Sequence, residues 1–221
     1  MNKTATRAGF WSVLIVLVCT VVFMAAFMIY IYVSTMKWEG MRAFAAAFKE
    51  GLYLAWVIPC LLLALAFPVF GASISFIAED KGRFWAFISL IFSVMYGAIL
   101  TTDYWLLLTV VRGSITGGNF TGLPWLVIGS PYSITNSIEG IGYCFMGLSF
   151  IFHGLSFTGS KLALWIRSLL LVNGIATALS VVVAVLGVMA VSWVAGHLGC
   201  YISHYHGFAG GGFQAAHGID G

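Results

Sequence analysis

The chain has 221 residues, of which 61% are hydrophobic and only 8% are charged. A soluble domain of this length has about a quarter of its residues charged. The composition therefore excludes a water-soluble globular protein and predicts an integral membrane protein. The formal net charge of +3 comes from scattered Lys and Arg residues rather than from a basic block. We therefore expect no nucleic-acid partner.

Five long apolar stretches fill most of the chain, and a transmembrane helix needs about 20 such residues. We predict an all-α integral membrane protein, a five-helix transmembrane bundle with a long C-terminal helical segment. The predicted spans are residues 11–34, 53–77, 84–111, 138–157 and 163–190. They form a single transmembrane helical domain over residues 1–206, and a Gly-rich C-terminal tail follows at 207–221.

Local signals refine the first four spans. The second span contains Pro59 and Pro68, and each proline removes a backbone hydrogen bond, so we expect a kinked or locally opened helix. Before it, residues 41–48 are rich in Ala and Phe and are expected to form a short interfacial helix. The fourth span is expected to start with Asn136 as its N-cap, because Glu139 follows three residues later in a pattern close to a capping box.

Small residues recur at helical spacing in the third and fourth spans. Such stripes let membrane helices approach closely, so we predict that these two spans pack against each other through them. The stripes consist of Ser89, Ser93, Gly97 and Thr101 in the third span, and of Gly140, Gly147 and Gly154 in the fourth.

Two acidic residues lie inside or at the start of predicted spans. Asp103 is in the third span beside Tyr104, and Glu139 and Tyr143 are in the first turns of the fourth. A carboxylate at membrane depth is costly and commonly functional. The four side chains are therefore a candidate cation or proton site, or a contact for a partner. In the alternative interpretation Asp103 hydrogen-bonds within the bundle and Glu139 caps its helix.

The histidines suggest two further sites. His153 lies in the fourth span without a second histidine at similar depth, which favours a structural hydrogen bond over a haem ligand. Near the C-terminus, His197, Cys200 and His204 would share one face of a helix, and with His206 they could hold a metal ion. Their spacing matches no zinc module that we can name. The sequence therefore implies neither a metal nor a haem strongly, and the cofactor stays unknown.

The last apolar stretch continues past the length of one membrane crossing. Trp193, Leu198, Tyr201 and Tyr205 lie in this extension and would form an exposed apolar surface larger than monomers usually leave uncovered. Lipid contact would favour basic residues nearby, but none follows Arg167. We therefore predict that this segment packs against another subunit, identical or not.

The distribution of basic residues indicates an orientation. More Lys and Arg residues flank the spans on the side of the N-terminus than on the opposite side. The positive-inside tendency therefore predicts a cytoplasmic N-terminus and an external C-terminus.

No catalytic motif occurs in the sequence, so we expect a non-enzymatic protein. The leading hypothesis is a structural or accessory subunit that lies in the lipid bilayer and associates through its helices with itself or with other membrane subunits. One alternative is a small ion or solute transporter or channel centred on Asp103. The other is a membrane electron-transfer or metal-binding subunit that uses the C-terminal histidines.

Overall fold

The structure, a computed structural model, describes residues 3–34, 38–131 and 133–186. This part of the chain is all-helical and contains five helices that are long and apolar enough to cross a membrane. The predicted helical class and the five apolar helices are thereby confirmed. The candidate metal ligands, the predicted subunit contact at residues 193–205 and the Gly-rich tail lie outside the described residues.

Three of the five long helices are longer than the apolar stretches that predicted them. The five long helices are α1 Lys3–Ser34, α3 Glu50–Ile77, α4 Asp80–Leu106, α6 Ile134–Ser156 and α7 Lys161–Leu186. The short elements are α2 Met41–Ala47, the π-helix η1 Leu107–Val111, α5 Arg112–Thr116 and the 3₁₀-helix η2 Leu123–Trp125. Helical backbone continues into the charged residues at the ends of several apolar stretches. The predicted fifth span reaches residue 190, of which the part to Leu186 lies in the described chain.

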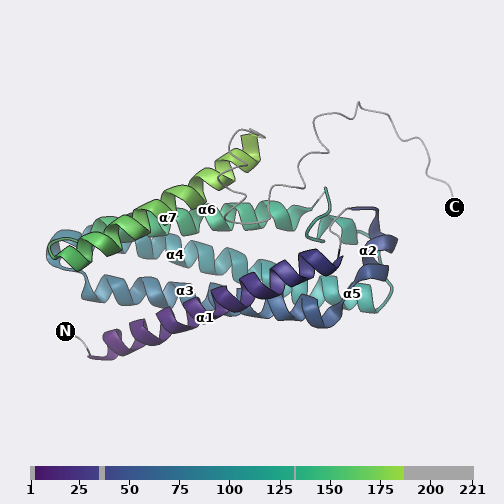
Figure 1. Cartoon of the computed structure of the whole chain (residues 1–221), viewed down its shortest axis with the longest axis horizontal. Coiled ribbons are helices and arrows are strands. Elements are labelled where there is room, and N and C mark those ends of the chain that lie inside the picture. The colour runs from purple at the N-terminus through teal and green to yellow at the C-terminus, as the bar shows by residue number, and fades with distance from the viewer. Residues whose placement is uncertain (1–2, 35–37, 132, 187–221) are drawn as a thin grey trace.

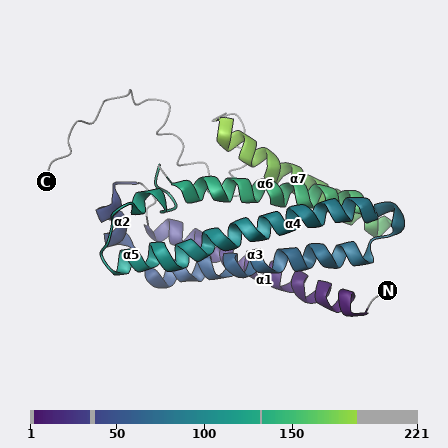
Figure 2. The same ribbon diagram turned by 180° about the vertical axis from the view of Figure 1, so that it is seen from behind.

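The long helices form a row in which each packs mainly on its neighbours in chain order. α1 packs on α3, α3 on α4, α4 on α6 and α6 on α7 (Figures 1 and 2). The three inner helices α3, α4 and α6 hold most of the buried side chains. One end of the row carries α2, α5 and the start of α6, and we call it the α2 end. The N-terminus, the α3–α4 turn and the α6–α7 turn lie at the opposite end.

Pro68 illustrates how an irregular residue is accommodated in this row. Helix α3 runs through both of its prolines. A Cβ added to Gly97 of α4 would meet the Pro68 ring at 2.5 Å and the Ala64 carbonyl oxygen at 3.0 Å. Glycine at position 97 therefore lets α4 lie directly on the proline turn of α3.

The small-residue stripes contact more helices than we predicted. Ser89 and Ser93 do face α6, but Gly97 faces α3, and Gly147 and Gly154 face α7. The reason is that α4 and α6 each lie between two neighbours. A repeat in the sequence places residues on one face of a helix without identifying the helix that packs there.

The start of α6 also differs from the prediction. The N-cap is Ser133, whose side-chain oxygen accepts a hydrogen bond from the Asn136 backbone N–H over 3.2 Å. Ser133 is an ordinary N-cap residue, and the helix begins at Ile134 rather than at 138. Glu139 is therefore more than a turn inside the helix and does not cap it.

Candidate functional site

Antiparallel packing of α4 and α6 pairs their buried polar residues. The Oγ atoms of Ser93 and Ser149 are 2.8 Å apart. Towards the α2 end, Leu100 lies against Gly142. The same register, continued by one turn, brings Asp103 of α4 opposite Glu139 of α6. Two acidic residues that are 36 positions apart in the sequence thus belong to one site.

Asp103 is fully buried, with an exposed fraction of 0%. Neither of its carboxylate oxygens has a hydrogen-bond partner among the described residues. Burying an ionised carboxylate without a partner is very unfavourable, and such a group becomes neutral instead. Asp103 is therefore a side chain that needs a proton or another cation to be stable where it lies. The alternative of a hydrogen bond within the bundle does not match this geometry.

Glu139 is also buried, at 2% exposure, but it has a partner. The Tyr104 hydroxyl donates a hydrogen bond to its carboxylate and lies 3.2 Å from the Tyr143 hydroxyl. Asp103 and Glu139 also interact electrostatically. Because two nearby carboxylates in a low-dielectric interior do not both ionise, the pair holds at least one proton or cation. The structure thus brings all four candidate residues into one region.

Three further residues belong to this region and were missed in the sequence. Cys60 is buried beside Tyr104, and Tyr53 interacts electrostatically with both carboxyl groups. The buried Tyr96 interacts electrostatically with Glu139, and its hydroxyl has no hydrogen-bond partner among the described residues. The available signal was the presence of tyrosine hydroxyls inside apolar spans. This signal could not identify the three residues. Two of them lie on α3, and the spacing of residues in the sequence does not show which residues of α3 lie beside which residues of α4.

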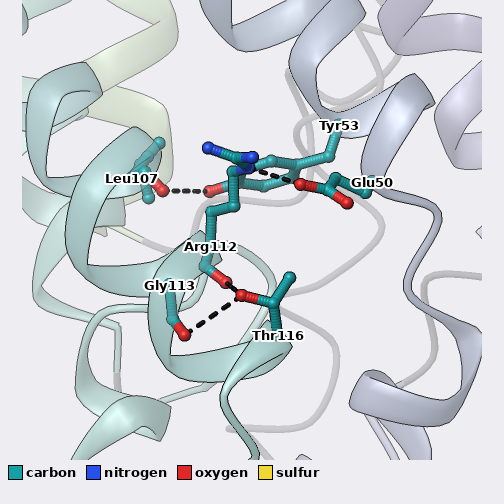
Figure 3. A network of polar contacts seen from close by, with 6 residues as sticks. All are labelled: Glu50, Tyr53, Leu107, Arg112, Gly113 and Thr116. Atoms are coloured by element: carbon teal, nitrogen blue, oxygen red, sulfur yellow. Dashed lines mark hydrogen bonds and ion pairs between the residues drawn. The ribbon is translucent and has the colours of Figure 1, made fainter.

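Figure 3 shows the network that holds the α2 end of the site. The Tyr53 hydroxyl donates to the Leu107 carbonyl oxygen over 3.2 Å. Leu107 opens the π-helix η1, and π-helical turns inside α-helices occur frequently at functional sites. Arg112 Nε donates to Glu50 Oε1 over 2.6 Å, and both side chains are half-exposed. These contacts fasten the first turn of α3 to the end of the long helix that carries Asp103.

The basic side chain nearest in sequence to Asp103, in the part of the chain that the structure describes, is engaged elsewhere. Arg112 is paired with Glu50 and lies nine residues beyond Asp103, which is about 13 Å along a helix. Asp103 and Tyr104 act on Glu139, and Tyr53 interacts electrostatically with both carboxyl groups. No cluster of three or more His, Cys, Asp or Glu side chains that could hold a metal ion occurs in the described ranges. The site is thus an acidic pair surrounded by hydroxyl groups.

A second polar cluster lies on the same two helices towards the other end. His153 is fully buried, and its Nδ1 is 2.5 Å from Ser89 Oγ and 3.3 Å from Ser149 Oγ. The expected structural hydrogen bond of His153 is therefore present.

Comparison of the chain with known protein families, with curated proteins and with solved structures found no match.

Proposed function

We propose that this is a multi-pass membrane protein that binds protons at the Asp103–Glu139 pair and uses them in transport, as a proton-coupled transporter or a proton channel. The observation that carries the proposal is Asp103, a fully buried carboxyl group that has no hydrogen-bond partner in the described part of the chain and lies opposite a second buried acid. Ionisable side chains at membrane depth commonly belong to ion pathways and proton relays.

A purely structural role explains this arrangement poorly. A buried polar group that lacks a partner destabilises a fold, and an apolar side chain would pack there at lower cost. A proton fits the pair better than a larger cation, because it needs no shell of oxygen ligands. Tyr104 contributes by holding Glu139 through its hydroxyl, which makes the two carboxyl groups chemically different.

Proton flux in liposomes tests the proposal. Purified wild-type protein is reconstituted with an internal pH dye, and flux is recorded after a pH step. We expect flux in the wild type and a loss to the level of protein-free liposomes in Asp103→Asn and Glu139→Gln. Thr102→Ala is the matched control, since Thr102 is exposed on the same helix and bonds only the Ala98 carbonyl. Flux in Asp103→Asn equal to that of the wild type would contradict the proposal.

A second candidate function is an accessory subunit that assembles through its outer helices. It is favoured by α7, which packs on α6 and leaves its other face apolar and exposed. This face includes Leu162, Trp165, Leu169, Val172 and Leu179. Deleting residues 193–221 tests the assembly that the sequence predicts. A lower mass on native electrophoresis, with the remaining helices still inserted, supports the subunit role, and an unchanged mass argues against it.

A further inference from the structure

The α4–α6 contact carries buried polar groups at three levels. Ser89, Tyr96 and Asp103 are spaced by seven residues on α4 and are all buried, so they share one face of the helix. On α6, Glu139 and His153 lie opposite the two outer levels. Successive levels are about 10 Å apart along the helix. The acidic pair is therefore one of two titratable sites on the same contact, and His153 is the other.

One arrangement of the hydroxyl hydrogens around His153 accounts for its shortest contacts. Ser93 Oγ donates to the Ser89 carbonyl oxygen over 3.0 Å, so its lone pairs are left to accept from Ser149 Oγ at 2.8 Å. Ser89 Oγ donates its single hydrogen to the Ser149 carbonyl oxygen over 2.6 Å. It therefore accepts from the group at 2.5 Å, which is His153 Nδ1. The network favours the neutral tautomer with hydrogen on Nδ1.

This tautomer leaves a lone pair on Nε2, and no described residue forms a hydrogen bond with Nε2. The Gly71 carbonyl of α3 lies near the ring but outside hydrogen-bond geometry for Nε2. A Cβ added to Gly71 would meet Ser93 Oγ at 2.5 Å and His153 Cε1 at 3.5 Å. Glycine at this position therefore lets the backbone of α3 approach the imidazole. A lone pair without a donor thus lies close to a carbonyl oxygen.

We propose that His153 Nε2 is a second proton-binding site of the protein, and its place on a transport route rests on the function proposed above. The lone pair of Nε2 takes the proton, the Nδ1–H bond to Ser89 stays in place, and the Gly71 carbonyl on α3 is an acceptor close to the ring. Within residues 3–186, as far as the structure describes them, the groups that contact the ring are uncharged. From α3 they are Gly71 and the Phe70 ring, whose centroid is 5.4 Å away, from α4 Ser89, and from α6 Ser149. Histidines inside transmembrane segments commonly belong to proton relays.

The tautomer and the protonation of His153 are measured directly by nitrogen NMR. The full chain carries labelled histidine and is placed in lipid nanodiscs, and the His153 signals are assigned by their loss in His153→Gln. We expect the Nδ1–H tautomer at high pH and its conversion to imidazolium as the pH is lowered. Ser89→Ala removes the acceptor for Nδ1–H and should produce a mixture of tautomers, whereas Thr102→Ala should leave the signals unchanged. An Nε2–H tautomer, or a ring that stays neutral wherever the bundle is folded, overturns the proposal.

Flux measurements separate this proposal from the function on which it rests. His153→Gln should lower the liposome proton flux to background if the wild type has such flux. A titrating His153 in a protein without flux overturns the transport function and leaves the proton site in place. Full flux in His153→Gln, or flux in a protein whose His153 does not titrate, removes His153 from the route and overturns the inference.

Discussion

Leu100 of α4 fills the space that a side chain at Gly142 of α6 would occupy. This contact fixes the register of the two helices one turn away from the acidic pair. A longer side chain at position 142 would push the helices apart at the level where Asp103 and Glu139 meet. The absence of a side chain at one glycine thus contributes to the geometry of the candidate site.

Gly142→Ala should destabilise the bundle by about 1–3 kcal/mol, because the new methyl group forces Leu100 to move in a packed interior. The measurement is chemical or thermal unfolding in detergent. Gly140→Ala is the matched control, since a Cβ at position 140 meets nothing within 4 Å. That control should be neutral or stabilising by roughly 0.5–1 kcal/mol, as alanine is the better helix former. Equal effects of the two substitutions would contradict the packing argument.

Gly174→Ala should have a larger effect than Gly142→Ala and should loosen α7. A Cβ at Gly174 would lie 2.6 Å from the Gly147 carbonyl oxygen and 2.8 Å from the Ile151 nitrogen. Both are backbone atoms, so the two helices must separate rather than repack a side chain. The loss is measured by unfolding, and the separation by disulfide cross-linking of cysteine pairs placed across α6 and α7. Gly113→Ala, at an open helical position, is the control, and undiminished cross-linking in Gly174→Ala would refute the close crossing.

The sequence was sufficient for the class of fold and for the residues of the acidic pair. Both follow from one-dimensional signals, because a span needs only length and apolar composition and an acid within it is conspicuous. Because Asp103 lies near the end of the third span and Glu139 near the start of the fourth, the two had to lie near the same end of the bundle. Their burial and the missing partner of Asp103 could not be derived, since both depend on the rotation of α4 against α6.

The sequence could not predict which helix packs against a given face of another helix. Gly147 and Gly154 sit on a regular repeat, but only the row order of the helices shows that they face α7. Tyr53 joins the site through a hydrogen bond to the Leu107 carbonyl, 54 residues away. The π-helical turn at this carbonyl leaves no signature in the apolar pattern.

Tyr53→Phe should destabilise the protein by about 1 kcal/mol, the usual contribution of one hydrogen bond. The substitution keeps the ring, which packs against Trp56 at 5.4 Å between centroids, and removes the donor to Leu107. Unfolding in detergent measures the loss. Tyr32→Phe serves as control because Tyr32 is 87% exposed and should change stability by less than about 0.5 kcal/mol. Indistinguishable effects of the two substitutions would mean that the Leu107 bond contributes nothing.

Asp103→Leu should raise stability while it removes proton flux. The wild-type carboxyl group is fully buried and neither oxygen has a partner, so an apolar side chain of similar size relieves a cost of roughly 1–3 kcal/mol. Glu139→Leu should gain less, because it also leaves the Tyr104 hydroxyl without its acceptor. Thr102→Leu, at an exposed position of the same helix, should change stability by less than about 0.5 kcal/mol.

Unfolding measurements on the three variants, combined with flux measurements, separate a functional from a structural role of the acid. A stabilised Asp103→Leu protein without flux means that the fold carries this carboxyl group for its chemistry. A variant that instead loses 2 kcal/mol or more, on the order of a broken buried network, would show that Asp103 holds the bundle together. The proposed proton site would then have to be abandoned, since its premise is a carboxyl group without a structural partner.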